Sequence, residues 1–204
     1  MKVTTYTTSE KYNCFVWLPP RTSTNRMSWI LNYFDFTSTI VDNETKEIIN
    51  KTNNPLTFGH ELSLPPNYQS LDFICTVRHP YHQFLSAYNA TINPLKSPTT
   101  KDFEEFINNR IINPKSVQFL YTNLFVDKSP NYIVRSENFY EDLLKIPFIK
   151  ESDLNTSGVL QNFCTKRINE SFNKLNPEEF LTQSIKDLIY SQTKQHFDLF
   201  GYQK

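Results

Sequence analysis

The segment from residue 15 to residue 30, FVWLPPRTSTNRMSWI, limits the folds open to this chain more than any other segment does. An apolar run typical of a buried strand enters a short turn of proline, arginine, threonine and serine, and the turn leads directly into a helix with one apolar face. Backbone N–H groups at a helix start, together with hydroxyl side chains and a cation, form a site for phosphate or a phosphate-like anion. Because the turn has no glycine and no lysine, the nucleotide pattern G-x-x-x-x-G-K-[ST] is absent, and the anion is not expected to be bound as Mg-ATP is bound.

The alternation of strand and helix continues along the chain. Residues 12–18 and 71–77 are predicted to be buried strands, and each is followed by a helix whose apolar residues recur at i, i+3, i+4 and i+7. These apolar faces are Met27, Ile30, Leu31 and Phe34 in the first helix and Tyr81, Phe84, Leu85 and Tyr88 in the second. Strands alternating with helices predict an α/β fold, a single domain over residues 1–204 with three layers, α/β/α, around a central parallel sheet.

The other predicted elements are shorter or carry weaker signals. They are a strand at 131–135, helices at 100–112 and 137–144, a long last helix beginning near residue 176 with Leu181, Ile185, Leu188, Ile189 and Leu199 on one face, and a polar surface connection at 43–55.

Composition excludes several classes of protein. The 21 basic and 21 acidic residues cancel, so the basic stripe of a nucleic-acid-binding protein is not expected. No run approaches the ~20 apolar residues of a membrane span, and the start MKVTTYTT lacks the apolar region of a signal peptide. Of three cysteines, Cys14 and Cys75 lie in apolar runs and are expected to be buried and inert. These features favour a soluble, cytoplasmic protein with no nucleic-acid partner and no membrane span.

Two predicted parallel strands end in basic turns. Ligands of open parallel sheets bind beyond the carboxyl ends of the strands, where Arg21 follows the first strand and Arg78 follows the second. Ser86 comes eight residues after Arg78, about two helical turns, so this arginine and this hydroxyl can converge on one phosphate. Two anion sites at one sheet edge predict a ligand with two separated anionic groups.

These residues resemble the sulfotransferases that use 3′-phosphoadenosine 5′-phosphosulfate (PAPS). The sequence RTSTN at 21–25 is similar to the family's 5′-phosphosulfate loop, and VRHPYHQFLSAY at 77–88 is similar to its 3′-phosphate motif, R-x-P-x-x-x-x-x-S-x-Y. The segment FGHE at 58–61 is similar to the G-H segment of heparan-sulfate 2-O-sulfotransferase-like enzymes. IVRSENF at 133–139 resembles the family's later strand and acidic turn, and QHFDLFGY at 195–202 resembles the close of many carbohydrate sulfotransferases.

The resemblance implies a P-loop NTPase-like sulfotransferase fold and an enzyme that moves a sulfuryl group from PAPS to an acceptor hydroxyl, preferably on a carbohydrate, leaving the product PAP. No metal is required, and the sequence has no His/Cys/Asp cluster with metal-ligand spacing. The expected cofactor ligands are Arg21, Thr22, Ser23, Thr24, Asn25, Arg26, Arg78, Ser86, Lys166 and Arg167.

Catalytic roles follow from the same resemblance. Arg21 is expected to be the cation at the bridging oxygen, and His60 the general base because the ordinary pKa of histidine lies near working pH, with Glu61 as the runner-up. The family loop usually has glycine where Ser23 stands, and a Cβ there restricts how closely backbone can approach the phosphosulfate.

Alternatives stay open at the level of sequence. A P-loop kinase of a small molecule would need a lysine in the phosphate loop, which this turn does not have. A non-catalytic protein that binds PAPS or PAP is the other candidate, because Ser23 departs from the family and the chain is short. His60 can also be a packing residue in a loop, and Lys166 and Arg167 can be a solvated charge pair.

Overall fold

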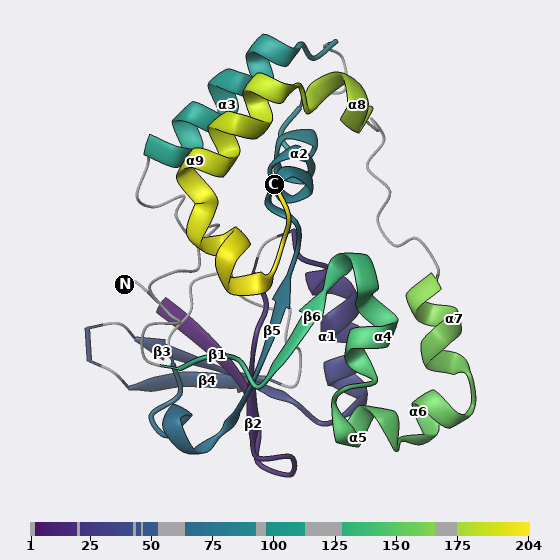
Figure 1. Ribbon diagram of the computed structural model, residues 1–204. Coiled ribbons are helices and arrows are strands. Elements are labelled where there is room, and N and C mark those ends of the chain that lie inside the picture. Colours follow the sequence, from purple (N-terminus) through teal and green to yellow (C-terminus); the bar gives the residue numbers. More distant parts are fainter. Residues whose placement is uncertain are drawn as a thin grey trace. The chain divides into compact units, whose positions relative to one another are not determined.

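The computed structural model describes residues 3–19, 21–42, 44–45, 47–52, 64–92, 97–112, 128–165 and 175–204. The chain folds into two compact units. Unit 1 consists of residues 1–77 and 125–168 and contains every strand of the described sheet, whereas the described elements of unit 2, residues 78–124 and 169–204, are helices. The predicted α/β class is therefore confirmed (Figure 1).

Unit 1 is built on a six-stranded sheet in the order β4-β3-β1-β2-β5-β6. Three strands run parallel to one another: β2 (Cys14–Trp17), β5 (Asp72–Val77) and β6 (Tyr132–Arg135). Antiparallel pairing joins the other three to the sheet: β1 (Val3–Ser9), β3 (Thr37–Asp42) and β4 (Ile48–Thr52). The prediction of a parallel sheet is thus correct for β2, β5 and β6 and wrong for the rest, and the sheet is mixed.

A hairpin between β1 and β2 is the reason for the mixed sheet. The two strands are joined by a turn at residues 10–13, in which Asn13 has a left-handed φ of 49°, a conformation that asparagine tolerates well. β1 has the sequence VTTYTTS, whose threonines and tyrosine favour strands but form no apolar run.

Residues 48–52, predicted as part of a surface connection, form β4, which lies at the edge of the sheet and is largely exposed.

The predicted buried strands at 12–18 and 71–77 are confirmed as β2 and β5. All four residues of β2 are buried, and on one face of the sheet the rings of Phe15 and Phe73 stack with their centroids 4.5 Å apart. Burial raises the pKa of Cys14 to about 12 and that of Cys75 well above its ordinary value. Both thiols are buried and remain protonated at neutral pH, as expected for inert cysteines.

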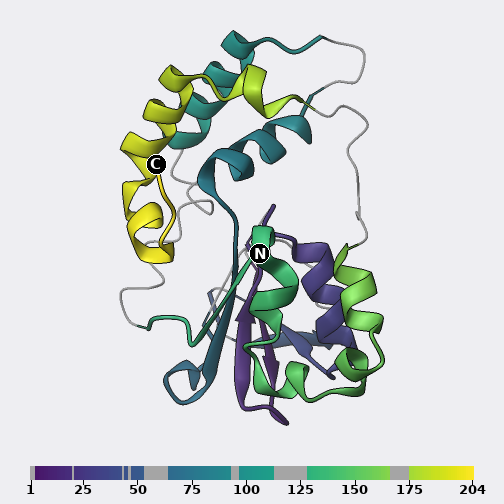
Figure 2. The ribbon, with the colours of Figure 1, turned by 45° about the vertical axis from the view of Figure 1, so that its right-hand side comes forward.

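One face of the sheet is covered by the helices of unit 1. These are α1 (Thr24–Tyr33), α4 (Phe139–Leu143), α5 (Pro147–Lys150), α6 (Asp153–Thr156) and α7 (Val159–Thr165). Figures 1 and 2 show α1 and α4 against the same side of the sheet. The predicted face of α1 is confirmed, because Met27, Ile30 and Leu31 are fully buried in a core that also holds Val16 and Ile74 of the sheet.

The described part of unit 2 is a helical bundle with an aromatic core. Its helices are α2 (Pro80–Asn89), α3 (Thr100–Ile112), α8 (Pro177–Phe180) and α9 (Gln183–Phe200), and α3 and α9 lie side by side in Figure 2. The predicted face of α2 is buried against Phe103 and Phe197. Pro80 occupies the first turn of α2, where a residue without an N–H costs no helical hydrogen bond. None of the described helices has the length and apolar character needed to span a bilayer.

The single long helix predicted from near residue 176 is divided into α8 and α9, with Thr182 as the N-cap of α9, and α9 is itself kinked. Thr193 has non-helical angles, φ −121° and ψ 16°, and its hydroxyl donates a 2.7 Å hydrogen bond to the carbonyl of Ile189. The kink changes which residues face the core, so His196, Phe197 and Phe200 are buried beyond it. Leu199, predicted to lie on the buried face, is 39% exposed.

Candidate anion-binding site

The turn between β2 and α1 forms a backbone nest at the carboxyl end of a parallel strand. Arg21 and Ser23 have left-handed φ values of 67° and 63°, and Thr22 between them does not have a positive φ. When successive residues alternate between left-handed and right-handed backbone conformations, their N–H groups point into one concavity. Such a concavity can bind an anion. The N–H groups of the first turn of α1, which begins at Thr24, add the positive end of a helix dipole.

Threonine hydroxyls stabilise this turn from within. Thr22 Oγ1 donates to the carbonyl of Pro19 at 2.6 Å, and Thr24 Oγ1 donates to the same carbonyl at 2.7 Å. Since the only hydroxyl proton of Thr22 goes to Pro19, the 2.8 Å bond between Thr22 and Thr76 has Thr76 as its donor. Thr22 is fully buried, so its side chain supports the loop, and its backbone N–H is the group left for an anion.

Thr22→Val is expected to lower the free energy of unfolding by about 1–3 kcal/mol, because valine has nearly the same shape but leaves the buried hydroxyl of Thr76 without the acceptor that it uses now. Urea denaturation followed by circular dichroism measures this. Thr165→Val removes an exposed hydroxyl that donates to the carbonyl of Asn162 and serves as the control, with a change within about 0.5 kcal/mol. Equal stability of both variants would show that the Thr22 hydroxyl does not support the loop.

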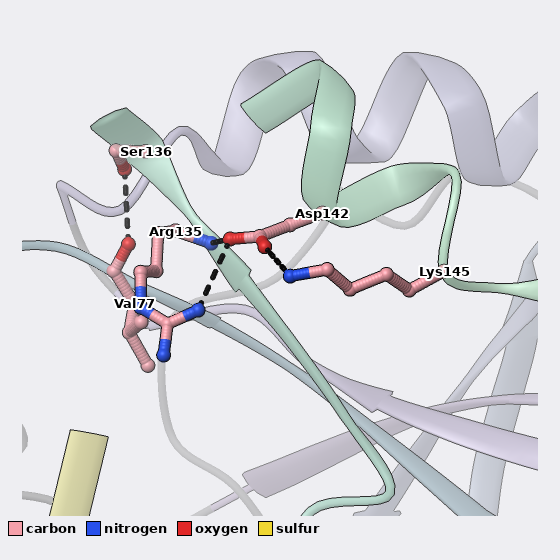
Figure 3. A network of polar contacts seen from close by, with 5 residues as sticks. All are labelled: Val77, Arg135, Ser136, Asp142 and Lys145. Atoms are coloured by element: carbon pink, nitrogen blue, oxygen red, sulfur yellow. Dashed lines mark hydrogen bonds and ion pairs between the residues drawn. The ribbon is translucent and has the colours of Figure 1, made fainter. Parts of the chain in front are cut away.

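Ser23 connects the turn to the ends of two other strands. Its hydroxyl donates to Ser136 Oγ at 3.0 Å. Ser136 Oγ donates in turn to the carbonyl of Val77 at 3.1 Å, the bond drawn in Figure 3. Val77 ends β5, and Ser136 directly follows β6. The sequence prediction did not include Ser136 among the site residues. Extending the strand-end rule to the third parallel strand would have identified it.

Arg135, the last residue of β6, was also not predicted as a site residue. It pairs with Val77 in the parallel register of β5 and β6. Asp142 of α4, whose side chain is only 2% exposed, accepts hydrogen bonds from the backbone N–H of Arg135 at 2.9 Å and from its guanidinium at 3.4 Å. Lys145 binds the other carboxylate oxygen at 2.5 Å (Figure 3). Two cations therefore share one buried carboxylate beside the end of β6.

The three other predicted ligands of the turn lie on or next to the start of α1. The Arg21 residue as a whole is exposed to solvent, but surrounding protein atoms partly desolvate its guanidinium. This desolvation lowers the pKa of Arg21 from its ordinary value, and the arginine still stays protonated at neutral pH. Asn25 is exposed in the first turn of α1. The guanidinium of Arg26 lies 5.9 Å from the ring centroid of Phe139, where it makes a cation–π contact.

Arg78 and Ser86 belong to unit 2. Arg78 directly follows β5, and Ser86 lies in α2, where it is partly buried. His79 between them caps α2, because its Nδ1 accepts a 3.3 Å hydrogen bond from the N–H of Tyr81. His196 is buried, and burial lowers its pKa to about 3 despite a hydrogen bond to the backbone of Arg78. Both histidines therefore have structural roles in unit 2.

Four predicted residues lie outside the described residues: His60, Glu61, Lys166 and Arg167. Within the described ranges, no group of three or more His, Cys, Asp or Glu side chains is arranged to hold a metal ion. Comparison of the chain with family models, curated proteins and solved structures gave no match. The candidate site is therefore interpreted from its own geometry and from the motifs of the sequence.

Proposed function

We propose that this protein is a sulfotransferase that moves a sulfuryl group from PAPS to an acceptor hydroxyl, with a carbohydrate as the favoured acceptor. The observation that carries the proposal is the nest formed by Arg21, Thr22 and Ser23 at the start of α1, beyond the carboxyl end of β2. The nest offers backbone donors and a cation without the lysine of a nucleoside-triphosphate loop. The proposal includes the three-layer sulfotransferase fold, and the parallel part of the sheet, β2-β5-β6, supports it.

In this proposal the nest binds the 5′-phosphosulfate. The S–O bond to the cofactor phosphate breaks as an S–O bond to the acceptor forms, and negative charge grows on the leaving phosphate. Arg21 is assigned the role of offsetting that charge, since a guanidinium can contact two oxygens at once. The acceptor proton passes to a base, for which the sequence favours His60 over Glu61. The 3′-phosphate is assigned to Arg78 and Ser86 on the sequence motif.

Ligand-induced stabilisation distinguishes this function from that of a kinase. PAP at about 100 times its dissociation constant is expected to add about 2.7 kcal/mol to the stability of the native state, or roughly 5–10 °C in melting temperature for a chain of this size. ATP with Mg²⁺ is the matched comparison, since it lacks the 3′-phosphate. Stabilisation by ATP-Mg²⁺ alone would overturn the proposal in favour of a kinase.

Transfer itself is tested with ³⁵S-labelled PAPS and a panel of glycans, phenols and peptides. Labelled product with a glycan is the expected result, and the release of PAP should match the label transferred. Stabilisation by PAP without transfer to any acceptor would indicate the non-catalytic PAPS-binding protein instead.

A further inference from the structure

Ser23 occupies a backbone conformation that favours glycine. Its φ of 63° and ψ of 28° place it in the left-handed region, at the N-cap of α1. For a residue with a Cβ this region is disfavoured by a factor of roughly 5 to 30 in population, whereas glycine adopts it freely. The nest needs this conformation, because only the alternation of handedness through Ser23 turns the N–H groups of the loop to one side.

A hydrogen-bonded relay fastens Ser23 in this conformation. Its hydroxyl donates to Ser136, and Ser136 donates in turn to the carbonyl of Val77, so the relay ends on a backbone atom of the central sheet. Both serines are partly buried. A neutral hydrogen bond of this kind shifts an equilibrium by a factor of about 2 to 10, which is the same order as the preference against the left-handed state. The relay can therefore offset much of that preference.

We propose that Ser136 is a positioning residue of the anion loop: its hydroxyl fixes Ser23 in the left-handed conformation and thereby replaces the glycine that such a loop would otherwise need. The proposal rests on the proposed function for the identity of the anion. Ser136 acts through Ser23 and does not contact the ligand. Its effect is to raise the fraction of molecules in which the loop is formed before the cofactor arrives, and apparent affinity is proportional to that fraction.

A double-mutant cycle tests the relay. In Ser136→Ala the dissociation constant of PAP, measured by calorimetry, is expected to rise about threefold to tenfold. Ser136→Thr keeps a hydroxyl and should restore most of the affinity. Ser23→Gly should bind PAP at least as well as the wild type, because glycine needs no relay. In that background Ser136→Ala is expected to have no further effect, so the two changes are not additive.

Three measurements separate positioning from general destabilisation. Ser157→Ala removes another hydroxyl that donates to a backbone carbonyl, and this control should leave PAP affinity unchanged. With PAPS as substrate, Ser136→Ala should raise KM and leave kcat at saturation unchanged, because the bound loop is the same. Amide hydrogen exchange at Met27, whose N–H donates to the carbonyl of Ser23 at 3.0 Å, should be faster in Ser136→Ala than in the wild type, with no ligand present.

The exchange measurement also keeps this proposal distinct from the proposed function. If the wild type does not bind PAP but Ser136→Ala still speeds exchange at Met27 and Ser23→Gly cancels that effect, the PAPS assignment is wrong and the relay stands. Additive effects of the two substitutions on PAP affinity and on exchange would overturn the relay. An unchanged PAP affinity and unchanged exchange in Ser136→Ala would overturn it as well.

Discussion

Replacement of Arg21 by alanine is expected to lower the rate of sulfuryl transfer from PAPS by about a hundredfold to a thousandfold, the usual effect of removing one group that stabilises developing charge. Arg21 lies within the nest and stays protonated at neutral pH, although burial lowers its pKa. Its charge matters most when the bridging oxygen becomes negative, so kcat should fall more than the affinity for PAP. Initial rates with ³⁵S-labelled PAPS and calorimetry with PAP measure the two quantities separately.

Two further variants sharpen the Arg21 experiment. Arg21→Lys keeps the charge but contacts one oxygen at a time, so its rate should lie between those of the wild type and Arg21→Ala. Lys150→Ala removes one positive charge from unit 1 at an exposed position on α5 and should leave the rate unchanged. A rate for Arg21→Ala within a factor of about three of the wild type would remove Arg21 from the reaction, because such a factor is below the effect of one stabilising donor.

The elements that the sequence predicted well are those with strong periodic signals. β2 and β5 are nearly continuous apolar runs, and such runs mark strands that are buried on both faces. α1 and α2 carry their apolar residues at i, i+3, i+4 and i+7, and those residues are buried. The boundaries of α3 also match, because residues 100–112 combine an apolar face with a polar start.

The strands that the sequence did not predict are antiparallel. β1 and β3 are rich in threonine and serine, and their stability depends on pairing with each other over six residue pairs. Such pairing is a tertiary contact and leaves little trace in local composition. The kink at Thr193 is a second example, because one side-chain hydrogen bond to the backbone of Ile189 shifts the buried face of α9.

The same division applies to the candidate site. The position of the turn from Arg21 to Thr24, between a buried strand and an amphipathic helix, was predicted from the sequence and is confirmed, whereas its binding of an anion stays a prediction. The hydrogen-bond partners of the hydroxyl groups were not predictable. The hydroxyls of Thr22 and Thr24 both donate to the carbonyl of Pro19 and not toward the anion site. The role of Ser136 depends on the register that sets Val77 beside Arg135, and this register exists only in the folded sheet.

Replacement of Asp142 by alanine is expected to lower the free energy of unfolding by about 2–3 kcal/mol, because the carboxylate is a charged acceptor for the backbone N–H of Arg135 and that N–H would lose its partner. The ion pairs contribute less. The side chains of Arg135 and Lys145 are 29% and 63% exposed. When the Asp142 carboxylate is removed, water can therefore solvate both cations and offset much of the lost ion-pair energy. Asp142→Asn keeps an amide oxygen for the N–H of Arg135 and should cost about 1 kcal/mol.

Urea denaturation followed by circular dichroism measures these differences, and Asp198→Ala provides the matched control. Asp198 also pairs with a lysine, Lys194 at 2.7 Å, but both side chains are exposed on α9, so its removal should not shift the urea midpoint measurably. If Asp142→Ala unfolds at the same urea concentration as Asp198→Ala, the bond to the backbone of Arg135 does not stabilise the end of β6. A midpoint shift for Asp142→Ala that Asp142→Asn largely reverses would identify that backbone bond, rather than the charge, as the main source of the stability.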